Sequence, residues 1–293
     1  MSVKRNQLTP YLFLLPGSII LGAFIFYPML NAIWLSFTDY NMVTQASFTG
    51  LENYKKLFAD ELFWKVLGQT FLYLIIVVPA LVILPIFLAI LVNQQVKGIA
   101  FFRSAYYVPV VTSMVVVGIM WKWVYADTGI LNYLLQATGI IDSPVHWLTS
   151  TSTSIFAVMA VTIWKGLGYY MVIYLAGLQS IPSDLYEAAD IDGASKWKQI
   201  LHITIPLLMP SIMIVSIMSS ISAMKVFEEI YVMTGGGPLN SSKTLVFYIY
   251  QQAFEKLQMG YASAAGVILF LLTLVLSVFN LRFMGKKEEA IKG

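Results

Sequence analysis

The 293-residue chain is 58% apolar and only 11% charged, with a net charge of +3. A soluble domain carries about 25% charged residues, so this composition excludes an ordinary water-soluble protein and indicates a surface that mostly faces lipid. The small, scattered charge argues against nucleic-acid binding. With no cysteine and only two distant histidines, His146 and His202, the chain also offers no thiolate metal site and no histidine-based triad.

Six apolar segments are long enough to cross a bilayer as helices, which takes about 20 residues. They are residues 11–37, 70–92, 106–125, 154–178, 207–226 and 264–284. We therefore predict an all-α membrane protein with six transmembrane helices. The first segment is too long for a cleavable signal peptide, so we expect it to remain as a span. Kinks are expected at the prolines inside these spans, namely Pro16, Pro28, Pro79, Pro85 and Pro109.

Lysine and arginine are unevenly distributed between the two sides of this arrangement. With both termini inside, ten of them fall in inner segments and five in outer ones, where acidic residues dilute them. Cytoplasmic loops carry the excess of Lys and Arg, so we predict that both termini are cytoplasmic. The inverted topology would place the basic clusters at both chain ends outside.

Three regions follow from this layout. Residues 1–69 form a first span and one external amphipathic helix over residues 50–69, lying on the outer interface or packing over the bundle mouth. Residues 70–284 form the transmembrane core, and residues 285–293 a cytoplasmic tail. The glycine-rich stretch 234–244 is predicted to be a loop, and it is not a phosphate-binding P-loop because Ser242 rather than glycine precedes Lys243.

The longest charged inner stretch, residues 182–206, predicts a helix-turn-helix elbow. Pro182 and the acidic residues after it mark a helix start, Gly193 can end or turn that helix, and Ser195 can cap a second helix over residues 196–203. Small alanines and the carboxylate of Glu187 would suit contact with another chain. An ordinary solvated loop explains the same residues equally well.

The spacing of this loop carries a family resemblance. Glu187-Ala188-Ala189, then Gly193 after three residues, then Ile203-Thr204-Ile205-Pro206 resemble the EAA loop of permeases from binding-protein-dependent ABC importers, with Ile205 in place of leucine. Other segments resemble the carbohydrate branch, specifically the first membrane subunit of maltose-type and glycerol-3-phosphate-type systems. These segments are residues 10–17, 35–41, 50–58, 101–109, 163–171, 175–195 and 232–238.

The resemblance implies a type I importer permease in a prokaryotic cytoplasmic (inner) membrane. Its partners would be a homologous second permease, two cytoplasmic ATPase subunits and an extracytoplasmic solute-binding protein. ATP and Mg would bind to the ATPase partners, so this chain would be no enzyme and would hold no cofactor or metal. Glu187 would pair with ATPase side chains, while Ala188, Ala189 and Gly193 would give close contact and the turn. Transport would proceed by alternating access.

Two predicted spans carry polar residues at helical spacing, which places them on one face of each helix. The members are Thr162, Lys165, Gly166 and Tyr169 in the fourth span, and Ser216, Ser219, Ser222 and Glu229 in and beyond the fifth. Polar groups inside a membrane span indicate a functional site by default. Two structural alternatives remain open: Lys165 and Lys225 can pair with Glu228 or Glu229, and serines can bond their own preceding turn.

The resemblance to the maltose subunit implies sugar contacts at Thr162, Lys165, Gly166, Tyr169, Ser219, Ser222, Ala223 and Val226, to which we add Glu229. The solute is expected to be a sugar, a polyol or a glycerol phosphate.

Two other function classes were weighed. An ion-coupled carrier would show paired, broken spans in two related halves, and no clear internal repeat is present. A membrane-embedded enzyme would need a nucleophile and a base in position, and no such constellation is evident. The sequence thus predicts an ATP-driven importer subunit, with the ion-coupled carrier as the alternative.

Overall fold

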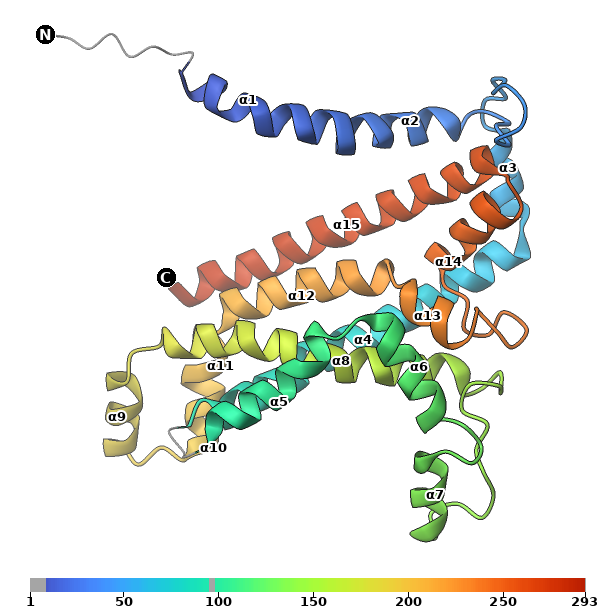
Figure 1. The fold of residues 1–293 in the computed structure, drawn as a ribbon. Helices are drawn as coiled ribbons and strands as arrows, with labels where there is room; N and C mark the ends of the chain where they lie inside the picture. Colours follow the sequence, from blue (N-terminus) through green and yellow to red (C-terminus); the bar gives the residue numbers. More distant parts are fainter. Residues whose placement is uncertain (1–8, 95–97, 293) are drawn as a thin grey trace, which may run out of the picture. The chain divides into compact units, whose positions relative to one another are not determined.

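The computed structural model describes residues 9–94 and 98–292 of the chain (Figure 1). Every regular element in these residues is a helix, and an isolated antiparallel bridge joins Thr38 to Phe48. The chain divides into two compact units, Met1–Glu61 with Ile249–Phe270, and Leu62–Tyr248 with Leu271–Gly293. Lys4, Arg5 and Lys97, on which part of the orientation argument depends, lie outside the described residues.

The first unit contains a helical span and the loop that follows it. The span consists of α1 (Thr9–Leu21), the π-helix η1 (Gly22–Phe26) and α2 (Tyr27–Leu35). The π segment ends just before Pro28, whose missing N–H cannot bond four residues back. None of the residues in the apolar stretch Tyr11–Leu35 is buried within this chain. The side chains of this span are therefore only lightly covered by the described residues of the chain.

The loop of the first unit is fixed by hydrogen bonds from buried Asn53. This residue lies in α3 (Glu52–Ala59), and its Nδ2 donates to the carbonyls of Ser36 at 2.9 Å and Thr38 at 2.7 Å. Helix α15 (Met259–Lys292) starts beside the same loop, where the Gly260 N–H donates to the Tyr40 carbonyl at 2.9 Å. The unit also includes the π-helix η3 (Gln251–Glu255).

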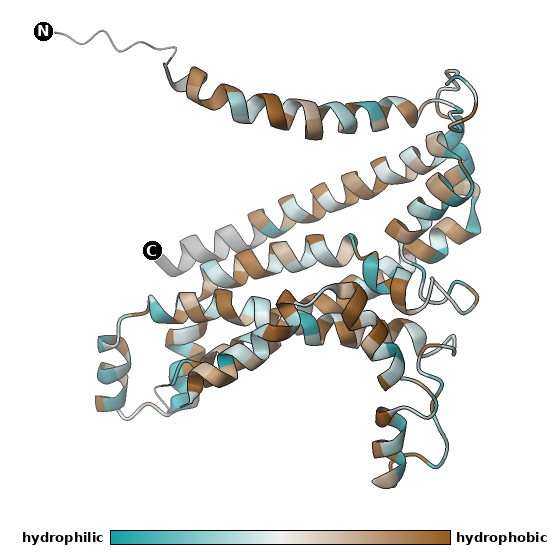
Figure 2. Ribbon diagram, viewed as in Figure 1, coloured by the Kyte–Doolittle hydropathy of each residue, from teal (hydrophilic) through white to brown (hydrophobic). Residues whose placement is uncertain are grey.

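The second unit holds the remaining helices. They are α4 (Glu61–Val92), α5 (Ile99–Val111), α6 (Met114–Val124), α7 (Ile130–Ala137), α8 (Ser154–Gln179), α9 (Asp184–Ile191), α10 (Lys196–Gln199), the π-helix η2 (Ile200–Thr204), α11 (Ile205–Leu207), α12 (Met209–Met224), α13 (Glu228–Met233) and α14 (Leu245–Tyr250). Apolar residues dominate these helices, and hydrophilic residues gather around α9 and α10 (Figure 2).

The core of this unit lies between α4, α8 and α12, and its buried hydroxyls are satisfied within the protein. Tyr174 donates to the Val82 carbonyl at 3.0 Å, and the hydroxyls of Tyr73 and Thr162 bond to each other. Because lipid offers no hydrogen-bond partner, such internal pairing is required of polar groups inside a span.

The prediction of six spans agrees with the structure when bent helices are counted as single spans. Four helices are individually long and apolar enough to cross a membrane, and two bent pairs, Ile99–Val111 with Met114–Val124 and Lys196–Leu207 with Met209–Met224, complete the six. The fourth span is confirmed almost to the residue by α8. The sixth is longer than expected, since α15 continues through residues 285–292.

Two predicted elements are wrong in detail. The single helix over residues 50–69 is broken at Asp60, which has extended backbone (ψ 111°), so α4 starts at Glu61 and runs directly into the second span. The third span is not continuous but bends by 101° at Thr112 and Ser113. There the Thr112 hydroxyl donates to the Val108 carbonyl at 2.9 Å, and the Thr112 backbone is extended (ψ 136°). By contrast, α4 passes Pro79 and Pro85 as one helix.

Helices α5 and α8 approach closely at Gly168, and this contact gives a stability prediction. A Cβ at Gly168 would collide with the Tyr106 carbonyl oxygen, whereas a Cβ at Gly68 in α4 would meet no atom within 4 Å. We expect Gly168→Ala to cost about 1–3 kcal/mol of unfolding free energy through overpacking, while Gly68→Ala is neutral or stabilising by up to about 1 kcal/mol. Thermal unfolding in detergent measures the stability of both variants. Equal melting temperatures for Gly168→Ala and Gly68→Ala would contradict the close contact of α5 with α8 at Gly168.

Candidate functional site

The predicted elbow is present at one end of the second unit. Helix α9 starts at Asp184, Gly193 turns the chain with a φ of +73°, and the Ser195 hydroxyl caps α10 by accepting from the Lys198 N–H at 3.4 Å. The positive φ explains the glycine, because other residues rarely adopt it. The second helix continues as the π-helix η2, so it remains helical over the predicted range 196–203.

The residues predicted for ATPase coupling lie mostly on the outside of this elbow. Glu187, Ala188 and Gly193 are exposed, and Ala189 is half-buried. In the described part of the chain, the Glu187 carboxylate has no hydrogen bond or ion pair. Ile191, one turn further along α9, is 87% exposed. A carboxylate, a small residue and an apolar side chain are thus available to another molecule.

Polar contacts join α9 to α10 and to the π-helix η2. Asp190 accepts from Lys196 Nζ at 2.8 Å and from Gln199 Nε2 at 2.5 Å. Both donors stabilise the ionised carboxylate, so they hold the pKa of Asp190 below its ordinary value. Tyr186 shares a second hydrogen bond with Thr204 at 2.9 Å.

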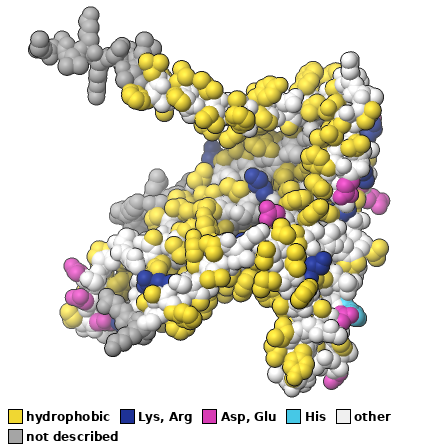
Figure 3. Space-filling model, in the orientation of Figure 1, with side chains coloured by type: hydrophobic (Ala, Val, Ile, Leu, Met, Phe, Trp, Pro, Cys, Tyr) yellow, Lys and Arg dark blue, Asp and Glu magenta, His cyan; other side chains and the backbone are white. Residues whose placement is uncertain are grey.

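A cavity of about 460 Å³ lies toward the other end of α12. It is formed by α6, α8, α12 and the segment leading into α13. Its lining residues are Met114, Lys165, Ile221, Ser222, Lys225, Val226, Phe227, Glu228 and Glu229. Two lysines, two glutamates and a serine therefore line one hollow, which is an unusual concentration of charge in an apolar bundle. Figure 3 shows how few charged side chains stand among the hydrophobic ones on one face of the molecule.

The structure brings together four of the residues predicted to bind substrate: Lys165, Ser222, Val226 and Glu229. The other five do not line this cavity. Thr162 bonds to Tyr73, Gly166 packs toward Leu81, and Tyr169 stands edge-to-face with Tyr170. Ala223 is buried. Ser219 is fully buried, and its hydroxyl donates to the Val215 carbonyl at 2.7 Å, as serines on membrane helices often do.

The charged residues of the cavity are not paired with one another. Among the described residues, no ion pair within 4.0 Å joins Lys165 or Lys225 to Glu228 or Glu229. Lys165 nevertheless lies near enough to Glu229 for the two charges to interact electrostatically, so the alternative that these lysines tie helices together stays open. Sequence reasoning missed Met114 and Phe227, which reach the cavity because the chain breaks before α6 and after α12. Hydropathy carries no signal for such breaks.

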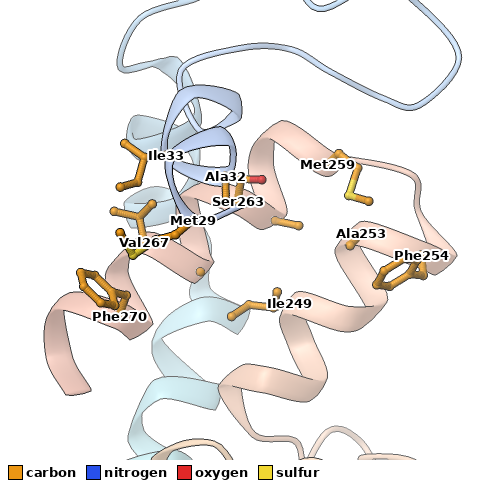
Figure 4. Close-up of a pocket in the computed structure, with 12 residues that line it drawn as sticks. Met29, Ala32, Ile33, Ile249, Ala253, Phe254, Met259, Ser263, Val267 and Phe270 are labelled. Carbon is orange, nitrogen blue, oxygen red and sulfur yellow. The ribbon is translucent and has the colours of Figure 1, made fainter. Parts of the chain in front are cut away.

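A second hollow, within the first unit, is apolar, whereas the cavity at the end of α12 is lined by charged residues. The second hollow has a volume of about 340 Å³ and is lined almost entirely by apolar side chains, including Met29, Ile33, Phe254 and Phe270 (Figure 4). Ser263 is the polar residue in its wall. A hydroxyl-rich solute would find few hydrogen-bond partners there. Among the described residues, no group of three or more His, Cys, Asp or Glu could hold a metal ion.

Comparison with known proteins decides the family. The model of the binding-protein-dependent transport system inner membrane component matches residues 59–286. The chain belongs to this family of permeases. The permease is 37% identical to a probable ABC transporter permease protein, YurN, of Bacillus subtilis, over 98% of its own length and all of that protein. The resemblance seen in the EAA loop is thereby confirmed.

Other relatives carry more specific names. The permease is 36% identical to the arabinooligosaccharides transport system permease protein AraP of Bacillus subtilis, with 96% of this chain and 90% of AraP covered. It is 34% identical to the lactose transport system permease protein LacF of Rhizobium radiobacter, with 98% and 97% covered. These relatives are named as transport system or ABC transporter permeases, and none of the three is named as an ion-coupled carrier.

A solved structure shares the fold along almost the whole length. A chain of a bacterial alginate ABC transporter, crystallised in complex with an alginate pentasaccharide-bound periplasmic protein, matches with a TM-score of 0.83 and 25% identity. The match covers 96% of the permease and 95% of that chain. The predicted all-α, type I importer fold is confirmed.

The lowered pKa of Asp190 predicts how the elbow responds to acid. A depressed carboxyl pKa contributes stability that is present above the unfolded value, about 3.9, and is lost as the pH falls through the lower folded value. We therefore expect the contacts of Asp190 to persist unchanged from pH 8 to pH 5 and to open only below pH 4. The 13C chemical shift of the Asp190 carboxyl group measures this, and a midpoint above 4 would contradict the contact with Lys196.

Proposed function

We propose that this permease is the membrane-spanning subunit of an ATP-driven importer for a sugar or sugar-like solute, delivered by an external binding protein. The observation that carries the proposal is the exposed EAA surface of α9, where Glu187, Ala188 and Ile191 have no cover from the described chain. A carboxylate flanked by small and apolar side chains suits a partner cleft that offers a basic group. The names of AraP and LacF support the sugar class.

The assembly proposed contains a homologous second permease, two cytoplasmic ATPase subunits and the binding protein. ATP and Mg would bind to the ATPase subunits. The span Tyr11–Leu35 supports a subunit or lipid partner, because the chain itself buries none of its residues. The alginate transporter in complex with a periplasmic protein is a precedent for the external partner. The elbow would face the cytoplasm of a prokaryotic inner membrane, with both termini on that side.

The proposed cycle links the two ends of α12. Closure of the ATPase dimer on ATP would move α9, and α12 would transmit that movement to the cavity, which then opens outward to receive the solute. Helix α12 is suited to this role because its first turns follow the elbow directly and its last turn carries Ser222 at the cavity. Two distant sites can be coupled when a packed helix between them has two discrete positions, and α12 would be that helix.

Substrate binding is proposed for the set Thr162, Lys165, Gly166, Tyr169, Ser219, Ser222, Ala223, Val226 and Glu229. Within it we assign direct contact to the four cavity residues, Lys165, Ser222, Val226 and Glu229, and assign the others to the wall behind them. Hydroxyl and charged groups would bond the hydroxyls of a sugar, polyol or glycerol phosphate, and Lys165 would favour an anionic group.

Replacing Glu187 tests the coupling role. We expect Glu187→Lys to lower ATP-driven uptake in proteoliposomes by about tenfold or more, because losing one partner of a buried charge pair costs about 2–5 kcal/mol. Asp142→Asn, an exposed carboxylate of the loop before α8, is the control and should retain parental uptake. Co-purification of the ATPase subunits should fall with Glu187→Lys only. Parental uptake and co-purification in Glu187→Lys would refute the assignment.

Substitutions at the cavity test the substrate assignment. We expect Ser222→Ala to raise the apparent KM for solute about three- to tenfold, since one hydrogen bond contributes about 0.5–1.5 kcal/mol. Lys165→Met should raise it further if the solute is anionic. The matched control is Ser277→Ala in α15, whose hydroxyl donates to the Thr273 carbonyl of its own turn, and it should change KM less than twofold. The assignment is wrong if Ser277→Ala and Ser222→Ala have equal effects.

A further inference from the structure

The elbow contains a potential hinge. Gly193 and the residues beside it join α9 to α10, and the positive φ of Gly193 marks a short, non-helical turn. A glycine turn bends easily, because glycine has the widest choice of backbone conformations. If the turn flexed, a push on α9 would be absorbed there and would not reach α12. The contacts that cross this turn therefore decide how the elbow behaves.

The first such contact, which we name the carboxylate clamp, is formed by Asp190, Lys196 and Gln199. Both Asp190 oxygens accept from Lys196 Nζ, at 2.8 and 2.9 Å, and Oδ1 also accepts from Gln199 Nε2 at 2.5 Å. The same Gln199 amide donates to the Ala194 carbonyl at 3.2 Å, and its Oε1 accepts from Lys196 at 3.3 Å. Gln199 is only 3% exposed. A buried amide with this many partners has a single favoured orientation.

The second contact, the hydroxyl clamp, lies at the other end of α9. The hydroxyls of Tyr186 and Thr204 are 2.9 Å apart, and Thr204 is 3% exposed. Thr204 ends the π-helix η2, in which the Ile205 N–H bonds back to the Ile200 carbonyl. Tyr186 and Asp190 are four residues apart and so share one face of α9. The two clamps thus hold α9 at two points, one near each end.

Space behind the elbow permits it to move. A cavity of about 530 Å³ separates it from the inner ends of α4 and α8 and is lined on that side by Ile90, Asn93, Gln94 and Leu178. The clamp residues Tyr186, Lys196, Gln199 and Thr204 form the opposite wall. The elbow is therefore held by its own clamps, the hollow lies between it and the ends of α4 and α8, and α11 connects it to α12 (Figure 1).

We propose that the two clamps make residues 184–204 one rigid lever, in which Tyr186, Asp190, Lys196, Gln199 and Thr204 are positioning residues for energy coupling. The lever transmits displacement of α9 to α12 without bending at Gly193. This rests on the proposed function, since it assumes that an ATPase moves α9. Gln199 and Thr204 of the clamps are buried, Asp190 and Lys196 stay partly exposed at the edge of the elbow, and Glu187 and Ile191 remain free for the partner.

Spin labels across the turn test rigidity directly, and the chain has no native cysteine to interfere. Nitroxides at Ser183→Cys and His202→Cys, both exposed, report the distance between α9 and η2. In the assembled transporter we expect one narrow distance distribution with the same mean in the nucleotide-free state and in the vanadate-trapped state. A mean that differs between the two states shows a hinge and overturns the proposal. This measurement needs no clamp substitution, so it does not depend on a variant that folds poorly.

A clamp variant tests the consequence for transport. Tyr186→Phe combined with Lys196→Met and Gln199→Met keeps the side-chain volumes approximately and removes the hydrogen bonds of both clamps. We expect a broadened label distribution and at least a fivefold lower ratio of solute imported to ATP hydrolysed, while the ATPase subunits still co-purify. Lys198→Met, on α10 outside both clamps, should keep the parental ratio. A parental ratio with a narrow distribution in the clamp variant overturns the lever.

The outcomes separate this proposal from the coupling assignment on which it rests. If the coupling role of Glu187 is wrong, Glu187→Lys keeps parental uptake and still co-purifies with the ATPase subunits, whatever the distances between the spin labels are. Failure of the lever appears as a nucleotide-dependent distance, or an unchanged coupling ratio in the clamp variant, with Glu187→Lys still defective.

Discussion

The inability of lipid to satisfy hydrogen bonds governs the whole structure. Backbone groups in the spans are satisfied by helices, and polar side chains in the core by one another, as in the pairs Tyr73 with Thr162 and Tyr174 with the Val82 carbonyl. Against this background, the charged groups of the cavity are conspicuous. Lys165 and Glu229 line the same hollow, and no ion pair within 4.0 Å joins them in the described part of the chain, which is why we propose the solute site there.

The two functional regions of the second unit depend on one helix. The elbow precedes α12, and the cavity lies at its far end, where the helix gives way to the short α13. Between them α12 packs against α8, and Ser219 keeps its hydroxyl within its own turn. The interior of α12 therefore has a structural role, while one end follows the elbow and the other carries Ser222 at the cavity.

Much of this architecture is visible in the sequence, and the failures have specific causes. Long apolar runs located the spans, and the spacing of Glu187, Gly193 and Pro206 located the elbow, because proline and glycine have strong local effects. The breaks at Asp60 and at Thr112–Ser113 were missed because each involves one or two residues inside an otherwise helical pattern. Helical spacing grouped Ser219 with Ser222, yet only the packing of α12 shows which of the two meets the cavity.

The bend between the elbow and α12 determines the direction of any stroke. The segment Lys196–Leu207 leaves the axis of Met209–Met224 at 68°. Had the two been collinear, turning α12 about its long axis would merely spin the elbow in place. With the bend, α9 lies off the axis of α12. The same rotation of α12 therefore displaces α9 sideways, and the displacement of α9 is larger than that of the side chains on α12 itself.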